Sequence, residues 1–134
     1  MKTVTRMIDD EVYEAVNENG NNIMIDMRKV EERQSQSPTE LLLSALAGCG
    51  AVDIVLMLKK RRRAVKGLVI ETTGTRREEE PRYFTAIHCH FLLTSPDATE
   101  EEMNKIVQLA LEKYCSVASS LKSKITFSAV VNKK

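Results

Sequence analysis

The sequence lacks an excess of charge of either sign. Its 134 residues include 20 lysines and arginines against 19 aspartates and glutamates. Nucleic-acid binding proteins usually concentrate positive charge, so we expect no nucleic-acid partner. One basic run, from Lys59 to Arg63, follows a long apolar segment. We interpret it as cations at the C-terminus of a helix, where they interact favourably with the helix dipole, and not as a phosphate-binding patch.

The chain also has few cysteines and no close pair among them. Its three cysteines are Cys49, Cys89 and Cys115. This spacing argues against a disulfide scaffold and indicates thiol chemistry in a reducing compartment. Because Met1 leads directly into charged and strand-like sequence, no signal peptide is visible. We therefore expect a cytoplasmic protein.

No internal repeat, low-complexity segment or repeating βαβ pattern is present, and the length predicts one domain over residues 1–134. Strands are expected at residues 2–8, 11–16 and 23–26, forming an antiparallel meander. A central helix, a β-hairpin of residues 67–75 and 82–94, a second helix pair that breaks near Cys115, and a last strand over 125–131 follow. This order is typical of the α+β class.

The central helix is predicted by a capping box. Ser37 is the N-cap, Pro38 suits the first helical position, and Glu40 lies three residues after the cap. The segment Leu41–Leu58 is apolar on every face, which predicts burial on all sides. A domain this small cannot easily enclose such a helix, so we expect a partner subunit to cover part of it. The capping box, Asp53 near the middle and the strand-like flanks argue against a membrane span.

Two cysteines are candidates for redox chemistry. Cys49 lies between Gly48 and Gly50, which leave space for a second backbone or a substrate to approach the sulfur; the alternative is an inert buried thiol. Cys115 lies at an expected helix start with Ser116 as candidate cap, where the helix dipole favours a thiolate. Together they suggest a nucleophile and its resolving partner.

The other candidate groups have structural interpretations. We expect Cys89 in the core and Asp53 bonded to backbone or arginine, because a carboxylate facing Cys49 would raise the thiol pKa. His88 and His90 share one strand face but have no third ligand at a suitable spacing, so no metal is expected. The hairpin arginines are most simply a solvated tip, with the alternative that one of them orients a thiolate: Arg76, Arg77 and Arg82.

Two motifs carry a resemblance to a known family. The segment SPTELLLSALAGCG resembles the first cysteine helix of the OsmC/Ohr family of osmotically inducible and organic hydroperoxide resistance proteins, and EKYCSVASSL resembles its second cysteine motif. The resemblance implies an intertwined homodimer and cofactor-free, thiol-dependent reduction of organic hydroperoxides. It implies that Cys49 attacks the peroxide, that Cys115 closes a disulfide, and that an external dithiol resets the pair.

The chain departs from the family pattern at three places. Thr39 stands where typical members carry a catalytic glutamate, Arg6 in the N-terminal meander has no matching context for the catalytic arginine, and Ser116 replaces the proline after the second cysteine. The chain therefore resembles a divergent OsmC-like branch. These losses also motivate an alternative function, a non-enzymatic dimer that binds a small hydrophobic or electrophilic ligand in the cysteine-lined cleft.

Overall fold

A computed structural model describes residues 1–134 and comprises two compact units, Met1–Leu42 and Leu43–Lys134. The N-terminal unit contains an antiparallel sheet of three strands in the order β1-β2-β3: β1 (Thr3–Asp9), β2 (Val12–Asn17) and β3 (Asn22–Asp26). In the turn between β2 and β3, the Asn17 side chain accepts hydrogen bonds from the backbone N–H groups of Asn19 and Asn21. The predicted meander is confirmed.

A buried carboxylate organises the segment after β3, which the sequence predicted only as a polar loop. The segment contains a 3₁₀ turn, η1 (Val30–Glu32). Asp26 is fully buried, pairs with Arg28 at 2.6 Å, and accepts a hydrogen bond from the backbone N–H of Gln34 at 2.9 Å. The hydrogen bonds from Arg28 and Gln34 hold the pKa of Asp26 well below its usual range.

Helix α1 (Pro38–Lys60) begins at the predicted capping box. The Ser37 N–H donates to the Glu40 carboxylate at 2.9 Å, and the Glu40 N–H donates to the Ser37 hydroxyl at 3.4 Å. These reciprocal bonds satisfy backbone donors that have no helical partner. Glu40 is therefore a capping residue, as predicted.

The C-terminal unit contains a second sheet in the order β4-β5-β6. Strands β4 (Gly67–Arg76) and β5 (Phe84–Thr94) form the predicted hairpin. Strand β6 (Lys124–Asn132) runs parallel to β5. Parallel pairing requires a crossover, which is supplied by α2 (Glu100–Leu109), the π-helical turn η2 (Ala110–Tyr114) and α3 (Ser116–Ser120).

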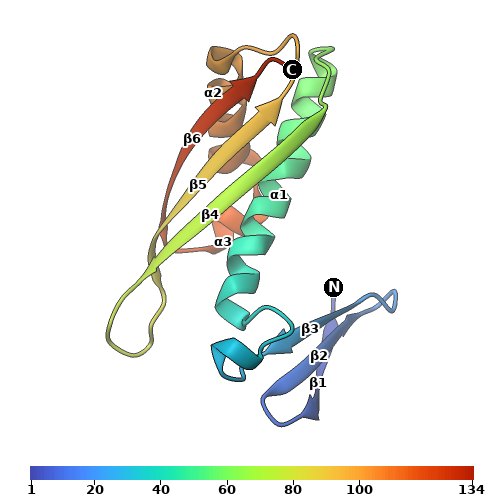
Figure 1. Ribbon diagram of the computed structural model, residues 1–134, viewed down its shortest axis with the longest axis vertical. Helices are drawn as coiled ribbons and strands as arrows, with labels where there is room; N and C mark the ends of the chain where they lie inside the picture. The colour runs from blue at the N-terminus through green and yellow to red at the C-terminus, as the bar shows by residue number, and fades with distance from the viewer. The chain divides into compact units, whose positions relative to one another are not determined.

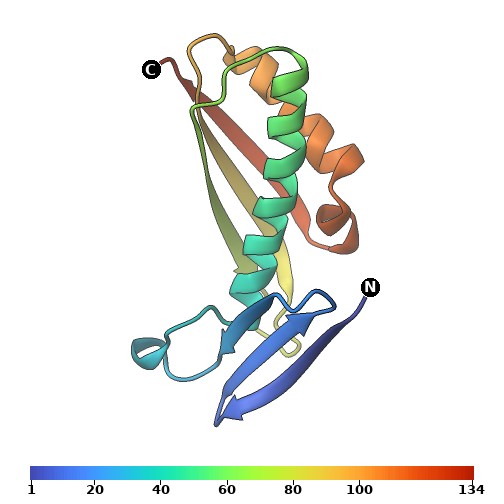
Figure 2. The ribbon, with the colours of Figure 1, turned by 90° about the vertical axis from the view of Figure 1, so that its right-hand side faces the viewer.

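Helices α1 and α2 cover the same face of this sheet (Figures 1 and 2). The core forms between that face and the helices. Strand β5 contributes Ile87, Cys89, Phe91 and Leu93, and α2 contributes Met103, Ile106 and Val107. Phe84 at the start of β5 belongs to the same core cluster, and its ring lies where a Cβ on Gly74 would be. On the other face Val69, Leu92 and Val130 are exposed. The core of this unit therefore lies on the helix-covered face of the sheet.

One strip of α1 is buried within the chain, not all of its faces. The buried residues recur every four positions, at Leu46, Gly50, Ile54 and Leu58. Val52 and Leu56 on other faces are 61% and 53% exposed. The helix is also long and apolar enough to cross a membrane by length and composition alone. The sequence predicted burial of α1 on all sides. Within one chain, however, the sheet and α2 cover only one side of this helix.

Candidate functional site

The fold brings the two candidate cysteines together. Cys49 lies half-buried on α1, and Cys115 is fully buried at the junction between η2 and α3. The Cys49 thiol lies close enough to that of Cys115 to raise its pKa. The residues are 66 positions apart in sequence (115 minus 49), so only the tertiary fold makes this contact. The sequence predicted the pair but not the contact.

Cys115 is itself the N-cap of α3, in place of the predicted Ser116. Its sulfur accepts a hydrogen bond from the Ala118 N–H at 3.3 Å. Its own N–H donates to the carbonyl of Ala110 at 2.8 Å and closes the π-helical turn. The turn ends at Cys115 because its backbone is extended there, with φ −74° and ψ 107°.

The sequence argument predicted a lowered pKa for Cys115, and the structure contradicts it. Burial raises the pKa of this thiol and outweighs the hydrogen bond from the Ala118 N–H, which lowers it. The adjacent Cys49 thiol raises the pKa further. Cys115 therefore holds its proton more strongly than an ordinary thiol.

The two glycines beside Cys49 differ in their surroundings. A Cβ placed on Gly50 would lie 3.5 Å from the Cδ2 atom of Leu111, an ordinary packing contact. A Cβ placed on Gly48 would meet nothing within 4 Å. Gly50 therefore faces the core, whereas Gly48 leaves open space beside Cys49. The sequence analysis expected both glycines to leave space for an approach to the sulfur. In this chain only Gly48 leaves such space.

Cys89 is a core residue, as predicted. It is fully buried on β5 opposite Thr72 of β4. Burial raises the pKa of its thiol from 9.0 to about 11, although the Thr72 hydroxyl acts in the opposite direction. That hydroxyl is buried and has no hydrogen-bond partner. The Cys89 thiol is therefore protonated at neutral pH.

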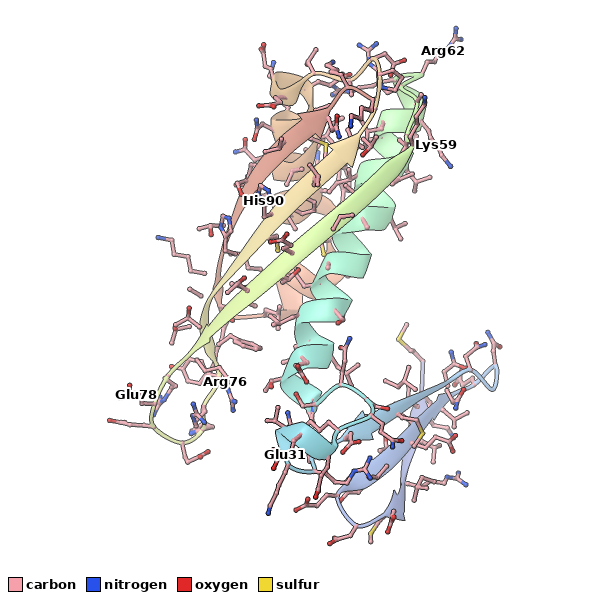
Figure 3. The ribbon with its side chains drawn as sticks, viewed as in Figure 1. Glu31, Lys59, Arg62, Arg76, Glu78 and His90 are labelled. Atoms are coloured by element: carbon pink, nitrogen blue, oxygen red, sulfur yellow. The ribbon has the colours of Figure 1, made fainter.

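His90 lies on the outer face of the sheet (Figure 3), and His88, two residues earlier on the same strand, shares that face. His88 contacts the hydroxyls of Thr126 at 2.7 Å and Ser128 at 3.0 Å, and His90 contacts the same Ser128 hydroxyl at 2.6 Å. No group of three or more His, Cys, Asp or Glu side chains is placed to hold a metal ion. The imidazoles are therefore satisfied by hydroxyl groups of β6.

The hairpin arginines form contacts within their own loop. Arg76 lies at the hairpin end of the sheet (Figure 3). Arg76 donates to the carbonyl of Arg82 at 2.7 Å, and Arg77 pairs with Glu79 at 3.3 Å. Arg82 donates in return to the carbonyl of Arg77. The alternative in which one of them orients a thiolate gains no support from these contacts. The solvated-tip interpretation agrees with them.

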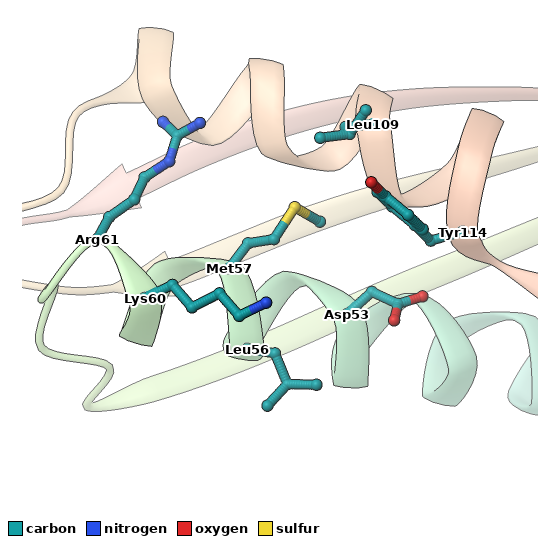
Figure 4. A pocket seen from close by; sticks show the side chains of 7 residues that line it. All are labelled: Asp53, Leu56, Met57, Lys60, Arg61, Leu109 and Tyr114. Atoms are coloured by element: carbon teal, nitrogen blue, oxygen red, sulfur yellow. The ribbon is translucent and has the colours of Figure 1, made fainter.

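Asp53 lines a cavity of about 420 Å³ that the sequence did not reveal (Figure 4). Tyr114, the residue before Cys115, lies on the opposite wall. Asp53 is one helical turn from Cys49, so this end of the cavity lies near the thiol pair. Of the two partners expected for Asp53, backbone or an arginine, the arginine is absent, since no ion pair involves Asp53. Only the i, i+4 spacing of Cys49 and Asp53 hinted at this arrangement.

The fold agrees with comparisons to known proteins. The family model described as "OsmC-like protein" matches residues 31–130. The chain belongs to the OsmC-like family. Protein YhfA of Escherichia coli K12 is 39% identical over 106 residues, which cover 79% of this chain and 78% of YhfA.

Solved structures of the same family share the fold. The OsmC-like protein from Mycoplasma pneumoniae matches with a TM-score of 0.83 at 22% identity, covering 97% of this chain and 95% of that one. The organic hydroperoxide resistance protein OhrB of Bacillus subtilis matches with a TM-score of 0.64 at 16% identity, covering 98% and 96%. The OsmC/Ohr family is associated with organic hydroperoxide resistance, and its members are generally homodimers.

Proposed function

We propose that this protein reduces organic hydroperoxides through Cys49 and Cys115, as a cytoplasmic enzyme of oxidative-stress defence. The observation that carries the proposal is the proximity of these two thiols, with Cys49 packed against the core cluster that contains Cys115. A nucleophilic thiol with a resolving thiol in contact is the working unit of cysteine-based redox catalysis. Membership of a family associated with hydroperoxide resistance supports the same reaction.

The different environments of the two thiols assign their roles. Cys115 is buried and has a raised pKa, whereas Cys49 is half-buried beside the open space at Gly48. The Cys49 thiolate attacks one peroxide oxygen, the O–O bond breaks, and the alcohol leaves after taking up a proton. Cys49 is then a sulfenic acid. The Cys115 sulfur attacks it, a disulfide forms, and the Cys115 proton leaves with the hydroxyl as water.

The disulfide requires an external dithiol to return both cysteines to the thiol state. Without the family glutamate at Thr39 and without a recognisable arginine near the thiols, the first step lacks groups that activate and orient the peroxide. We therefore expect slower peroxide reduction than in members that carry both residues.

The proposal includes a homodimer. Val52 and Leu56 expose apolar surface in the middle of α1, and the helix is apolar on its exposed faces as well as its buried one. A second copy that covers these faces would supply the burial that one chain does not. The general occurrence of homodimers in the family supports this arrangement.

Mass spectrometry after mild oxidation tests the redox pair. One equivalent of cumene hydroperoxide should produce a Cys49–Cys115 disulfide in the wild type and a sulfenic acid on Cys49 in Cys115→Ser. Cys49→Ser should consume no hydroperoxide with a dithiol reductant, and the control Cys89→Ala should retain wild-type consumption. Unmodified thiols in the wild type would refute the proposal and favour the alternative of a ligand-binding dimer.

A further inference from the structure

Cys89 is a buried nucleophile that the proposed mechanism does not use. It lies on the helix-covered face of β5, in the core cluster that also contains Cys115 and against which Cys49 packs. The three cysteines of the chain therefore gather in one core, although they are far apart in the sequence. A third thiol beside a redox pair can take part in thiol–disulfide exchange.

Cys115 is the neighbour that the other two cysteines share. The Cys49 thiol lies close enough to raise the pKa of Cys115, and Cys115 lies close enough to raise the pKa of Cys89. Cys115 belongs to the crossover between β5 and β6 and reaches the same core as Cys89. A disulfide at Cys115 can therefore be approached from α1 by Cys49 or from β5 by Cys89.

A hydroxyl group opposite Cys89 has no partner in the thiol form of the protein. Thr72 pairs with Cys89 across β4 and β5, and its hydroxyl oxygen is buried without a hydrogen-bond partner. Buried polar groups are almost always paired, because leaving one unpaired costs free energy. The Thr72 hydroxyl lowers the pKa of Cys89 and so favours the thiolate, which is the form that attacks a disulfide. It is therefore an available donor for an ionised Cys89.

We propose that Cys89 is a second resolving thiol, which attacks the Cys115 sulfur of the Cys49–Cys115 disulfide and returns Cys49 to the thiol state. The step rests on the proposed function, because the hydroperoxide reaction forms the first disulfide. The Cys89–Cys115 bond forms, the Cys49–Cys115 bond breaks, and the Cys89 proton passes to Cys49, so no further oxidant or reductant is required. Cys49 is the half-buried member of the three, and solvent can stabilise its charge as it leaves.

The exchange allows the chain to accept a second hydroperoxide before it is reduced. The released Cys49 thiol reacts with the second equivalent to form a sulfenic acid. Without a reductant, the wild type should therefore consume two equivalents per chain and Cys89→Ala one. Burial raises the pKa of Cys89 to about 11, so its thiolate is rare at neutral pH and the exchange is slow. A dithiol in excess reduces the first disulfide beforehand, and steady turnover does not require Cys89.

Trapping of the remaining free thiol tests the exchange. Diamide forms the first disulfide without hydroperoxide, the oxidant is removed, and samples are unfolded at intervals in a mildly acidic denaturant that contains a maleimide. Peptide mass spectrometry then identifies the labelled cysteine, which should change from Cys89 to Cys49 with time. Cys115 is oxidised at this stage, so the pH dependence reports Cys89. The rate should rise about ten-fold per pH unit below the pKa of Cys89, because the attacking thiolate is the minor species there.

Three variants serve as controls. Thr72→Val should slow the exchange about five-fold, because it removes the hydroxyl that favours the Cys89 thiolate. Thr73→Val changes an exposed neighbour and should leave the rate unchanged. Cys89→Ala should retain the Cys49–Cys115 disulfide and take up no maleimide.

Three results would overturn the proposal. They are a label that stays on Cys89, a label on Cys115, and an exchange rate that does not change with pH. Disulfide-linked dimers on a non-reducing gel would also overturn it, because the exchange would then occur between chains. A first disulfide that forms with diamide but not with hydroperoxide would refute the peroxidase function, while the position of the label would still decide the exchange. Failure of both oxidants to form the first disulfide would refute both proposals.

Discussion

Raising the pH should destabilise the fold through the buried thiol of Cys89. Its pKa is raised from 9.0 to about 11 by burial, whereas the unfolded chain exposes an ordinary thiol. The unfolded state therefore loses its proton first. The contribution to stability is fully present below pH 9 and is lost as pH rises through about 11. Two pKa units correspond to about 2.7 kcal/mol, of which about 1.4 kcal/mol is lost by pH 10.

Urea unfolding followed by circular dichroism measures this loss, at one protein concentration because any dimer would couple stability to concentration. The free energy of unfolding is compared between wild type and Cys89→Ala from pH 7.5 to 10.5. The alanine variant should be less stable at pH 7.5, because it leaves a small cavity, but its stability should fall less steeply with pH. Cys115 acts in the same direction in both proteins, so the difference between the two slopes isolates Cys89.

Thr72 provides a second check on the same thiol. Its hydroxyl lowers the Cys89 pKa, so Thr72→Val should raise that pKa and steepen the alkaline loss of stability. Thr73→Val is the matched control, because Thr73 is exposed and pairs with His88 on the outer side of β5. Parallel pH profiles for wild type and Cys89→Ala would show that the buried thiol does not control alkaline stability, and would refute the reasoning.

Three further substitutions test other parts of the fold by urea or thermal unfolding. Asp26→Asn should destabilise the protein at pH 7 and flatten its acid sensitivity, because the depressed Asp26 pKa stabilises the fold above about pH 4, the unfolded value, and that stability is lost as pH falls. Gly74→Ala should cost about 1–3 kcal/mol, since the new Cβ would lie 2.4 Å from the Phe84 ring, whereas Gly67→Ala, with 3.9 Å of clearance, should be tolerated. Ser37→Ala should cost about 1 kcal/mol through loss of the cap.

Local signals in the sequence predicted much of the fold. The Ser37–Glu40 capping box, the strand boundaries of the meander and the helix break at Cys115 depend on residues within a few positions of one another. Side-chain caps and turn residues act over that range, so they are readable without tertiary information. The two cysteine motifs identified the family in the same way, because each is a short continuous segment of the sequence.

Features that depend on distant residues were not predictable. Apolarity on all faces of α1 gave no indication that Leu46 and Ile54 face the core of this chain while Val52 and Leu56 remain exposed. The pKa of Cys115 was predicted with the wrong sign because the helix start was visible in the sequence but the depth of burial was not. The cavity beside Tyr114 likewise requires α1 and η2 to be placed together.

A substitution at Gly48 tests whether this glycine lowers the stability of α1 while leaving the Cys49 sulfur accessible to a substrate. Glycine inside a helix costs about 1 kcal/mol relative to alanine, and the space beside Gly48 is open. Gly48→Ala should therefore raise the free energy of unfolding by up to about 1 kcal/mol. If hydroperoxide reaches Cys49 across this position, the same variant should react more slowly with cumene hydroperoxide in stopped-flow measurements of thiol oxidation.

The matched control is Gly50→Ala, which gains the same helix propensity but directs its new Cβ at Leu111 in the core. Slower oxidation in Gly48→Ala alone, with the oligomeric state unchanged, would show that substrate approaches across Gly48. Weaker self-association in Gly48→Ala, measured by analytical ultracentrifugation, would show that a second backbone packs there instead. Equal rates and equal association in both variants would contradict any role of Gly48 in access, because the open space would then serve neither a substrate nor a partner.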